Sequence, residues 1–194
     1  MDVHPLTPSR FDDLAALFDT TAVTRNCHCT WFLLREPALT EVWKAGRSRE
    51  CFERFAESAP APAGVLAYAD DGAPVGWCAI GAREWYPRLE VARAWRGGDP
   101  SAWAVTCFYI RRQARHGGLS RSLLEAAVEL AGQHGATAVF GAPRADGMKT
   151  SGGDGYVGFE STFRACGFNR AAPPDGKRVL MRRDLGSGPV ASRP

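Results

Sequence analysis

The sequence predicts an α/β fold in which a mixed sheet of about seven strands is flanked by about four helices. Short runs of β-branched and aromatic residues, such as 65–68 and 105–110, alternate with longer runs in which apolar residues recur at helical spacing. Turn-forming residues separate these runs. With 194 residues, the chain has the length of a single domain. We therefore expect one domain over 1–185 and a disordered tail over 186–194.

Local signals define most of the elements. Thr7 and Pro8 have the residue types of an N-cap and a first helical position, and Asp70-Asp71-Gly72 is typical of a hairpin turn. Gly135 is expected to end the longest helix. The expected elements are a strand at Val3, a helix from Pro8 to Phe18, a helix over 40–58, strands over 65–68, 75–80 and 105–110, a helix over 119–134, a strand over 136–141, a helix over 159–166, and strands over 168–171 and 179–184.

Composition indicates an ordinary soluble globular protein, with 45% hydrophobic and 23% charged residues. No apolar run approaches the roughly 20 residues of a membrane-spanning helix, and the N-terminus lacks the features of an export signal. The six cysteines are scattered, which favours reduced thiols, with Cys78 and Cys107 in the core. We therefore expect a cytoplasmic protein that contacts no membrane. The net charge of +3 is explained by an anionic coenzyme as well as by a nucleic acid.

The connection between the strand at 105–110 and the helix that follows is the sharpest functional signal. It reads Arg115-His116-Gly117-Gly118-Leu119-Ser120. Glycines let a ligand approach the main chain closely, and the free N–H groups of a helix start attract phosphate. Arginines at 111, 112 and 115 add positive charge. The turn alone is also compatible with a strand–helix connection that binds nothing.

The stretch from Ile110 to Ser120 resembles the acyl-coenzyme-A-binding signature of the GNAT family of N-acetyltransferases, a hydrophobic strand end followed by Arg-x-x-Gly-x-Gly/Ala. Ser120 departs from the usual glycine or alanine. Phe163-Arg164-Ala165-Cys166-Gly167-Phe168 is similar to the family's closing Tyr-x-x-x-Gly-Phe element, with Phe163 in the place of the usual tyrosine. The order of elements agrees over roughly 3–184, and the resemblance implies a mostly antiparallel GNAT-like sheet.

The resemblance implies an N-acyltransferase that uses acetyl-CoA, or another acyl-CoA, as co-substrate and needs no metal. The residues expected to bind the coenzyme are Cys107, Phe108, Tyr109 and Ile110 along the pantetheine arm and Arg115, His116, Gly117, Gly118, Leu119, Ser120 and Arg121 around the pyrophosphate. A small-molecule or peptide amine would be the acceptor. It would enter beside the three irregular segments 22–37, 82–100 and 143–158.

Direct amine acylation needs a base for the amine and benefits from an acid for the thiolate. Glu84 is our first candidate base, since partial burial beside Trp85 and Tyr86 would raise its pKa; Glu90 and Asp99 are further candidates. The family's usual acid is a tyrosine, and with phenylalanine in its place Tyr156 or Tyr109 could substitute.

Other interpretations are open at this stage. A non-catalytic acyl-CoA-binding or sensing module is favoured by Phe163. An acyltransferase that contacts tRNA is favoured by the arginines at positions 83, 88, 93, 96, 111, 112 and 115. A homodimer is a common outcome for such chains. Cys27-His28-Cys29 offers too few ligands for a zinc site, and packing is the better interpretation. Gly153-Asp154-Gly155-Tyr156-Val157-Gly158 matches a dinucleotide pattern by chance, because no strand comes before it.

Overall fold

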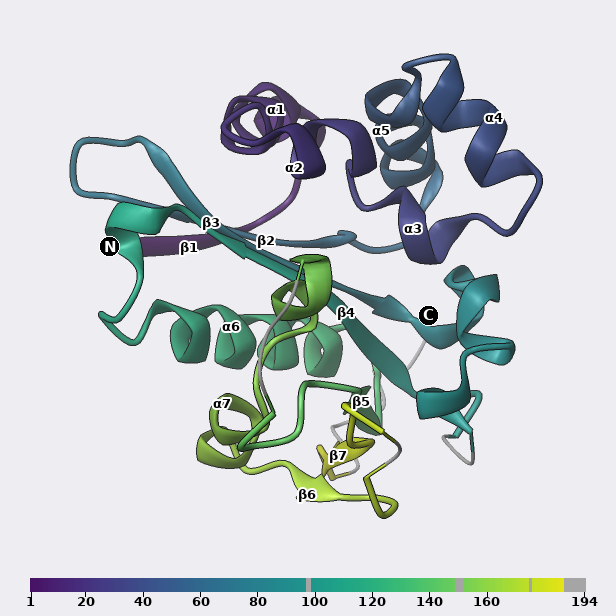
Figure 1. Ribbon diagram of the computed structural model, residues 1–194. Helices are drawn as coiled ribbons and strands as arrows, with labels where there is room; N and C mark the ends of the chain where they lie inside the picture. The colour runs from purple at the N-terminus through teal and green to yellow at the C-terminus, as the bar shows by residue number, and fades with distance from the viewer. Residues whose placement is uncertain (97–98, 149–151, 175, 187–194) are drawn as a thin grey trace, which may run out of the picture.

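A seven-stranded mixed sheet with the order β1-β2-β3-β4-β5-β7-β6 forms the centre of the computed structural model (Figure 1). The structure describes residues 1–96, 99–148, 152–174 and 176–186, with side chains for all but 152–154. The strands are β1 Asp2–Pro5, β2 Gly64–Tyr68, β3 Pro74–Ala82, β4 Trp103–Ile110, β5 Ala138–Gly141, β6 Asn169–Arg170 and β7 Met181–Asp184. Among these strands, β4 and β5 pair in parallel and all other neighbours are antiparallel.

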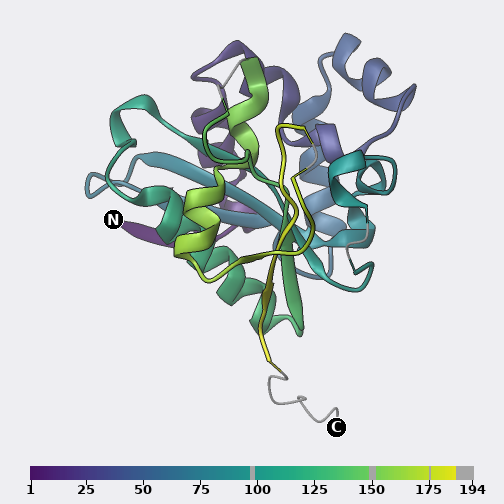
Figure 2. The same cartoon turned by 60° about the horizontal axis from the view of Figure 1, so that its bottom comes forward.

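Helices cover both faces of this sheet. They are α1 Phe11–Phe18, α2 Ala22–Cys27, α3 Thr30–Leu33, α4 Ala38–Lys44, α5 Ser48–Ser58, α6 Leu119–Gln133 and α7 Glu160–Ala165. The shorter 3-10 turns are η1 Pro8–Arg10, η2 Arg83–Trp85, η3 Pro87–Glu90, η4 Arg93–Trp95, η5 Arg112–Ala114 and η6 Gly152–Val157. Figure 1 shows α1 to α5 on one face and α6 and α7 on the other. Figure 2 brings α7 and the C-terminal strands to the front.

The alternation of side chains along the strands builds two apolar cores. In β2, Val65 and Ala67 point toward α6, whereas Leu66 between them points toward α1. The core on the α1 side is rich in aromatic rings, and Trp77 at its centre contacts Phe18 and Phe52 edge-on. Both faces of the sheet are therefore buried, and functional groups lie at strand ends and in connections.

The structure confirms the predicted fold class, and Gly135 follows the long helix in a left-handed conformation (φ +81°) as expected. Three local expectations are wrong. Segment 22–37 contains α2 and α3, and the helix expected over 40–58 is divided into α4 and α5 at Gly46 (φ +64°). Thr7 makes no cap hydrogen bond, because its hydroxyl contacts Ser9 and Arg10 instead. Except for Gly186, the expected tail lies outside the described residues.

A buried carboxylate fastens α7 to the preceding loop, and this contact carries a stability prediction. Glu160 is 1% exposed and accepts hydrogen bonds from the Asp146 amide (3.0 Å) and the Arg170 Nε (2.6 Å). The Arg170 guanidinium holds the pKa of Glu160 below its usual value of 4.5. Because the folded pKa is the lower one, this stabilisation is present above pH 4.5 and is lost as the pH falls through the folded pKa.

Glu160→Gln should therefore reduce the free energy of unfolding by about 1 kcal/mol at pH 7. This value is low for a hydrogen bond to a charged group, because Arg170 is half-exposed. Denaturant titration of both proteins at pH 7 and near pH 3 measures this difference. The two proteins should converge at the lower pH. A gap that is equal at both pH values would show that the charge of Glu160 does not contribute.

Candidate active site

The second half of β4 has no strand beside it on the β5 side. β4 pairs with β3 along its whole length, but it pairs with β5 only from Trp103 to Val105, where Val105 lies opposite Gly141. Beyond this point the two parallel strands separate. Main-chain N–H and C=O groups of 106–110 that face away from β3 therefore have no hydrogen-bond partners in β5. They can bind another group instead.

A β-bulge at Thr106 accounts for this separation. Ile80 lies opposite Val105 and Ala79 lies opposite Cys107, so that Thr106 is an extra residue in β4. The bulge also shifts the alternation of side chains: Val105 and Phe108 face the α6 core, whereas Cys107 packs against the core on the α1 side. Cys107 is consequently half-buried rather than in the core as expected.

The N-terminus of α6 forms an open corner next to the end of β4. Gly118 begins the helix with φ +81°, and a Cβ at Gly117 or Gly118 would meet no atom within 4 Å. Within the described residues, the main-chain N–H groups of 116–120 have no hydrogen-bond partner. A helix start with several unpaired donors and no side chain in front of them suits a phosphate group.

The predicted coenzyme-binding residues gather around this corner, although not all of them face it. The Arg115 Nε donates to the Ile110 carbonyl (2.9 Å), which folds this arginine back toward the end of β4. His116 adopts a left-handed conformation (φ +69°) and is exposed, as are Arg112 and Arg121. Phe108 and Leu119 are instead buried in the α6 core, so these two side chains support the site from below.

Two of the three segments expected at the acceptor side are in direct contact, and the third packs against β4. The Arg35 Nε donates to the Pro87 carbonyl (2.8 Å), and the Arg88 guanidinium lies 3.8 Å above the Trp31 ring, which joins 22–37 to 82–100. The third segment contributes η6, which packs against β4. Its Tyr156 ring lies 6.2 Å from that of Tyr109.

The two candidate tyrosines have different hydrogen-bonding states. Tyr109 is buried, and its hydroxyl is paired with the Thr20 hydroxyl. Thr20 gives its single proton to the Leu17 carbonyl (2.7 Å), so Tyr109 is the donor to Thr20. The hydroxyl proton of Tyr109 is therefore already used in the hydrogen bond to Thr20. Sequence reasoning missed Thr20, because nothing in a local pattern links α1 to β4.

Tyr156 is half-buried at the edge of the same cluster. Burial raises its pKa above the usual value of 10, and the nearby Thr21 hydroxyl offsets part of this rise. Tyr156 is thus a protonated phenol at neutral pH that retains access to solvent. Of the two tyrosines, it is the one with partial exposure to solvent.

The carboxylates proposed as bases lie outside this cluster. Glu84 is exposed at η2, contrary to the expected partial burial, because Trp85 and Tyr86 take the inward positions. Glu90 forms an ion pair with Arg35. Asp99 accepts hydrogen bonds from the Ser101 hydroxyl (2.7 Å) and amide (2.9 Å), which lower its pKa and make it a weaker base.

Phe163 is a core residue, and this explains why no tyrosine stands there. It is fully buried against Phe108 and Phe168, and a Cβ on Gly141 would lie 2.2 Å from its ring. A hydroxyl at this position would be buried against Gly141. We therefore expect Phe163→Tyr to reduce the free energy of unfolding by about 1–3 kcal/mol.

Denaturant titration measures this change, with Phe159→Tyr as the control because Phe159 is exposed on the same segment. Unchanged stability of Phe163→Tyr, or increased turnover, would contradict the assignment of Phe163 to the core.

Cys27-His28-Cys29 lies at the junction of α2 and α3, where His28 and Cys29 are buried. The His28 Nδ1 hydrogen-bonds the Arg25 carbonyl (2.8 Å), and its ring meets Phe18 edge-on. Among the described residues, no three potential ligands lie close enough to hold a metal ion. The part of the chain that the structure describes also contains no helix long and apolar enough to cross a membrane.

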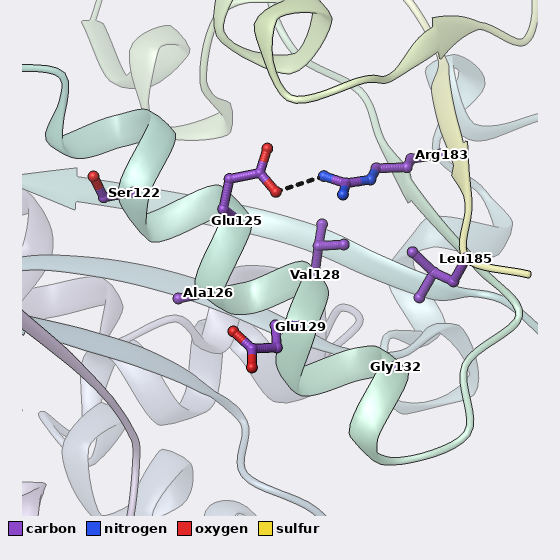
Figure 3. Close-up of a pocket in the computed structure, with 8 residues that line it drawn as sticks. All are labelled: Ser122, Glu125, Ala126, Val128, Glu129, Gly132, Arg183 and Leu185. Carbon is purple, nitrogen blue, oxygen red and sulfur yellow. Dashed lines mark hydrogen bonds and ion pairs between the residues drawn. The ribbon is translucent and has the colours of Figure 1, made fainter. Parts of the chain in front are cut away.

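A separate hollow of about 500 Å³ lies along α6 and the end of β7 (Figure 3). Glu125 points to Arg183 across it (2.7 Å), and Glu129 adds a second carboxylate. This lining is acidic overall and offers no row of free amides. It is therefore unsuited to a diphosphate, in contrast to the open corner at the N-terminus of α6.

Comparison with known proteins identifies the family and the fold of the chain. Residues 29–149 match the family profile described as the acetyltransferase (GNAT) family. No protein of curated function matches the sequence. The chain is similar in fold to the PaiA N-acetyltransferase of Thermoplasma acidophilum in complex with coenzyme A, with 13% identity, 95% and 98% of the two chains covered and a TM-score of 0.54.

Two further structures are similar. One is a phosphinothricin acetyltransferase of Sinorhizobium meliloti in complex with AcCoA, with 18% identity, 100% of this chain and 92% of that chain covered, and a TM-score of 0.51. The other is described as histone acetyltransferase HPA2 and related acetyltransferase from Corynebacterium glutamicum ATCC 13032, with 18% identity, coverage of 97% and 98%, and a TM-score of 0.55. At these identities the likeness concerns the fold.

Proposed function

Because the chain belongs to the acetyltransferase (GNAT) family, we propose that it is an N-acyltransferase that transfers an acetyl group from acetyl-CoA to a primary amine. The observation that carries the proposal is the open corner at Gly117 and Gly118, where unpaired amides at the start of α6 meet the end of β4 that has no partner in β5. These two features lie side by side because the chain passes from β4 to α6 through η5 alone. The corner would hold the diphosphate, and 106–110 would lie along the pantetheine arm.

The residues around the open corner and the end of β4 have different proposed roles. Main-chain N–H groups of β4 beyond the bulge would hold the developing oxyanion. Tyr156 would give its proton to the leaving thiolate. The thiolate needs little acid catalysis, since thiols have a pKa of about 8.5. None of the candidate carboxylates is enclosed beside Tyr156, so we propose that water carries the proton from the amine to solvent. Glu84 is then a surface residue.

The acceptor would be a small-molecule or peptide amine that enters between η3, α3 and η6. The aromatic and cationic groups at this entrance, Trp31 and Arg88 among them, suit an acceptor that carries an apolar or anionic group beside its amine. We propose no role for nucleic acid or membrane. A homodimer is compatible with this arrangement, since neither proposed entrance requires a second chain.

Calorimetric titration with acetyl-CoA tests the donor site, and release of free thiol with a library of primary amines tests the transfer. Binding with turnover is the expected result. Absence of binding at millimolar acetyl-CoA would refute the proposal. Tight binding without thiol release with any amine would instead support the sensing module suggested by Phe163.

A further inference from the structure

Two cysteines from distant parts of the chain pack against the same core beside the bulge of β4, where Cys107 lies opposite Ala79 and Ala79 shares the α1-facing side of β3 with Trp77. Cys29 lies between α2 and α3 in a left-handed conformation (φ +57°) and is buried. Its Sγ accepts a hydrogen bond from the Trp77 Nε1 (3.1 Å), which fixes the thiol above the β3–β4 pair. Cys107 is the second residue of the bulge and packs against the same core. The Cys107 thiol is the neighbour that contributes most to raising the pKa of Cys29.

The two thiols differ in access to solvent. Cys107 is half-buried, so a small oxidant can reach it, whereas Cys29 is shielded behind it. The other cysteines are less suited. Cys27 is also half-buried near Cys29, but burial raises the pKa of its thiol to about 11, so that little of it is the reactive thiolate. Cys78 and Cys166 are buried in the α6 core on the opposite face of the sheet. Cys51 is half-buried on α5 among charged residues, with no thiol beside it.

We infer that Cys107 and Cys29 form an oxidation-sensitive pair, in which Cys107 is the thiol that reacts with hydroperoxides and Cys29 is the thiol that resolves the product as a disulfide. In the first step the Cys107 sulfur attacks the peroxide, the O–O bond breaks, and Cys107 becomes a sulfenic acid while the peroxide leaves as water or an alcohol. In the second step the Cys29 sulfur displaces water from this sulfenic acid. One molecule of hydrogen peroxide thus oxidises two thiols and yields one disulfide and two molecules of water.

The new bond would tie the α2–α3 junction to β4 on the acceptor side of the proposed active site. It would not touch the amides at the start of α6. On the proposed function, on which this consequence rests, oxidation should therefore reduce turnover several-fold, and any change in the affinity for acetyl-CoA should arise at the pantetheine arm beside Cys107 rather than at the diphosphate. The formation of the disulfide itself does not depend on that function.

The test treats the reduced full-length protein with equimolar hydrogen peroxide and maps its peptides by mass spectrometry without reduction. We expect the peptides that contain Cys29 and Cys107 to be linked, and dithiothreitol to separate them. Cys29→Ser, which keeps an acceptor for Trp77, should leave a sulfenic acid on Cys107 that dimedone labels. Cys107→Ser should give no link, and Cys51→Ser should behave as the wild type.

Three results would overturn the inference: peptides that stay unlinked, a link between Cys27 and Cys29, or dimedone labelling at a cysteine other than Cys107. The mapping needs no variant, so a misfolded substitution does not weaken it. A linked protein that also lacks acetyl-CoA binding before oxidation would refute the proposed function and leave the thiol pair intact. Unchanged turnover of the linked protein would contradict its regulatory consequence.

Discussion

Gly117→Val is expected to weaken the binding of acetyl-CoA about a hundredfold and to leave the stability of the protein unchanged. The fold has room for this side chain, because a Cβ at this position meets no atom within 4 Å and the backbone is not left-handed. The same space is where a diphosphate would approach the amides of 116–120. Loss of two charge-assisted hydrogen bonds, at about 1.5 kcal/mol each, corresponds to roughly a hundredfold in Kd.

Calorimetric titration with acetyl-CoA gives the two dissociation constants, and thermal unfolding without ligand checks the fold. Gly132→Ala is the matched control, since it adds a Cβ near the other end of α6 in ordinary contact with Leu185 (3.7 Å). It should bind as the wild type does. If Gly117→Val also binds with unchanged affinity, the diphosphate does not lie at this corner.

The features that could be predicted from the sequence are those with local causes. The long helix from Leu119 and its glycine-rich start follow from neighbouring residues, because helix periodicity and glycine φ angles are properties of a short segment. The same holds for the hairpin of β2 and β3 about Gly72. The strand–turn–helix unit that carries the proposed coenzyme site was therefore visible in the sequence.

The features that could not be predicted depend on contacts between distant segments. The bulge at Thr106 is a matter of register between β3 and β4, and a threonine in a strand gives no sign of it. The hydrogen bond between Thr20 and Tyr109 joins the turn after α1 to β4. The expected burial of Glu84 fails for the same reason, since Trp85 packs against Phe55 and Trp103 and Glu84 is left exposed. On the acceptor side, sequence reasoning found candidates but not their environments.

Tyr156→Phe should lower kcat about a hundredfold, while the KM for acetyl-CoA stays close to that of the wild type. The ring and its contact with Tyr109 remain, so only the proton is removed. General-acid catalysis contributes about 10² to 10⁴ in rate, and the low end applies because a thiolate leaves readily. Steady-state thiol release with a saturating amine measures the effect.

Tyr109→Phe distinguishes this role from a loss of packing. Tyr109 already gives its proton to Thr20, so its removal should reduce kcat only a few-fold. The pH profile provides the sharper test. Because burial raises the pKa of Tyr156, the wild-type kcat should hold to about pH 10 and fall above it, as the phenol loses the proton it must donate. Tyr156→Phe should lack this decrease of kcat at alkaline pH. If Tyr156→Phe has the kcat of the wild type and the same decrease at alkaline pH, the thiolate leaves without an acid. Tyr156 would then serve only to cover β4.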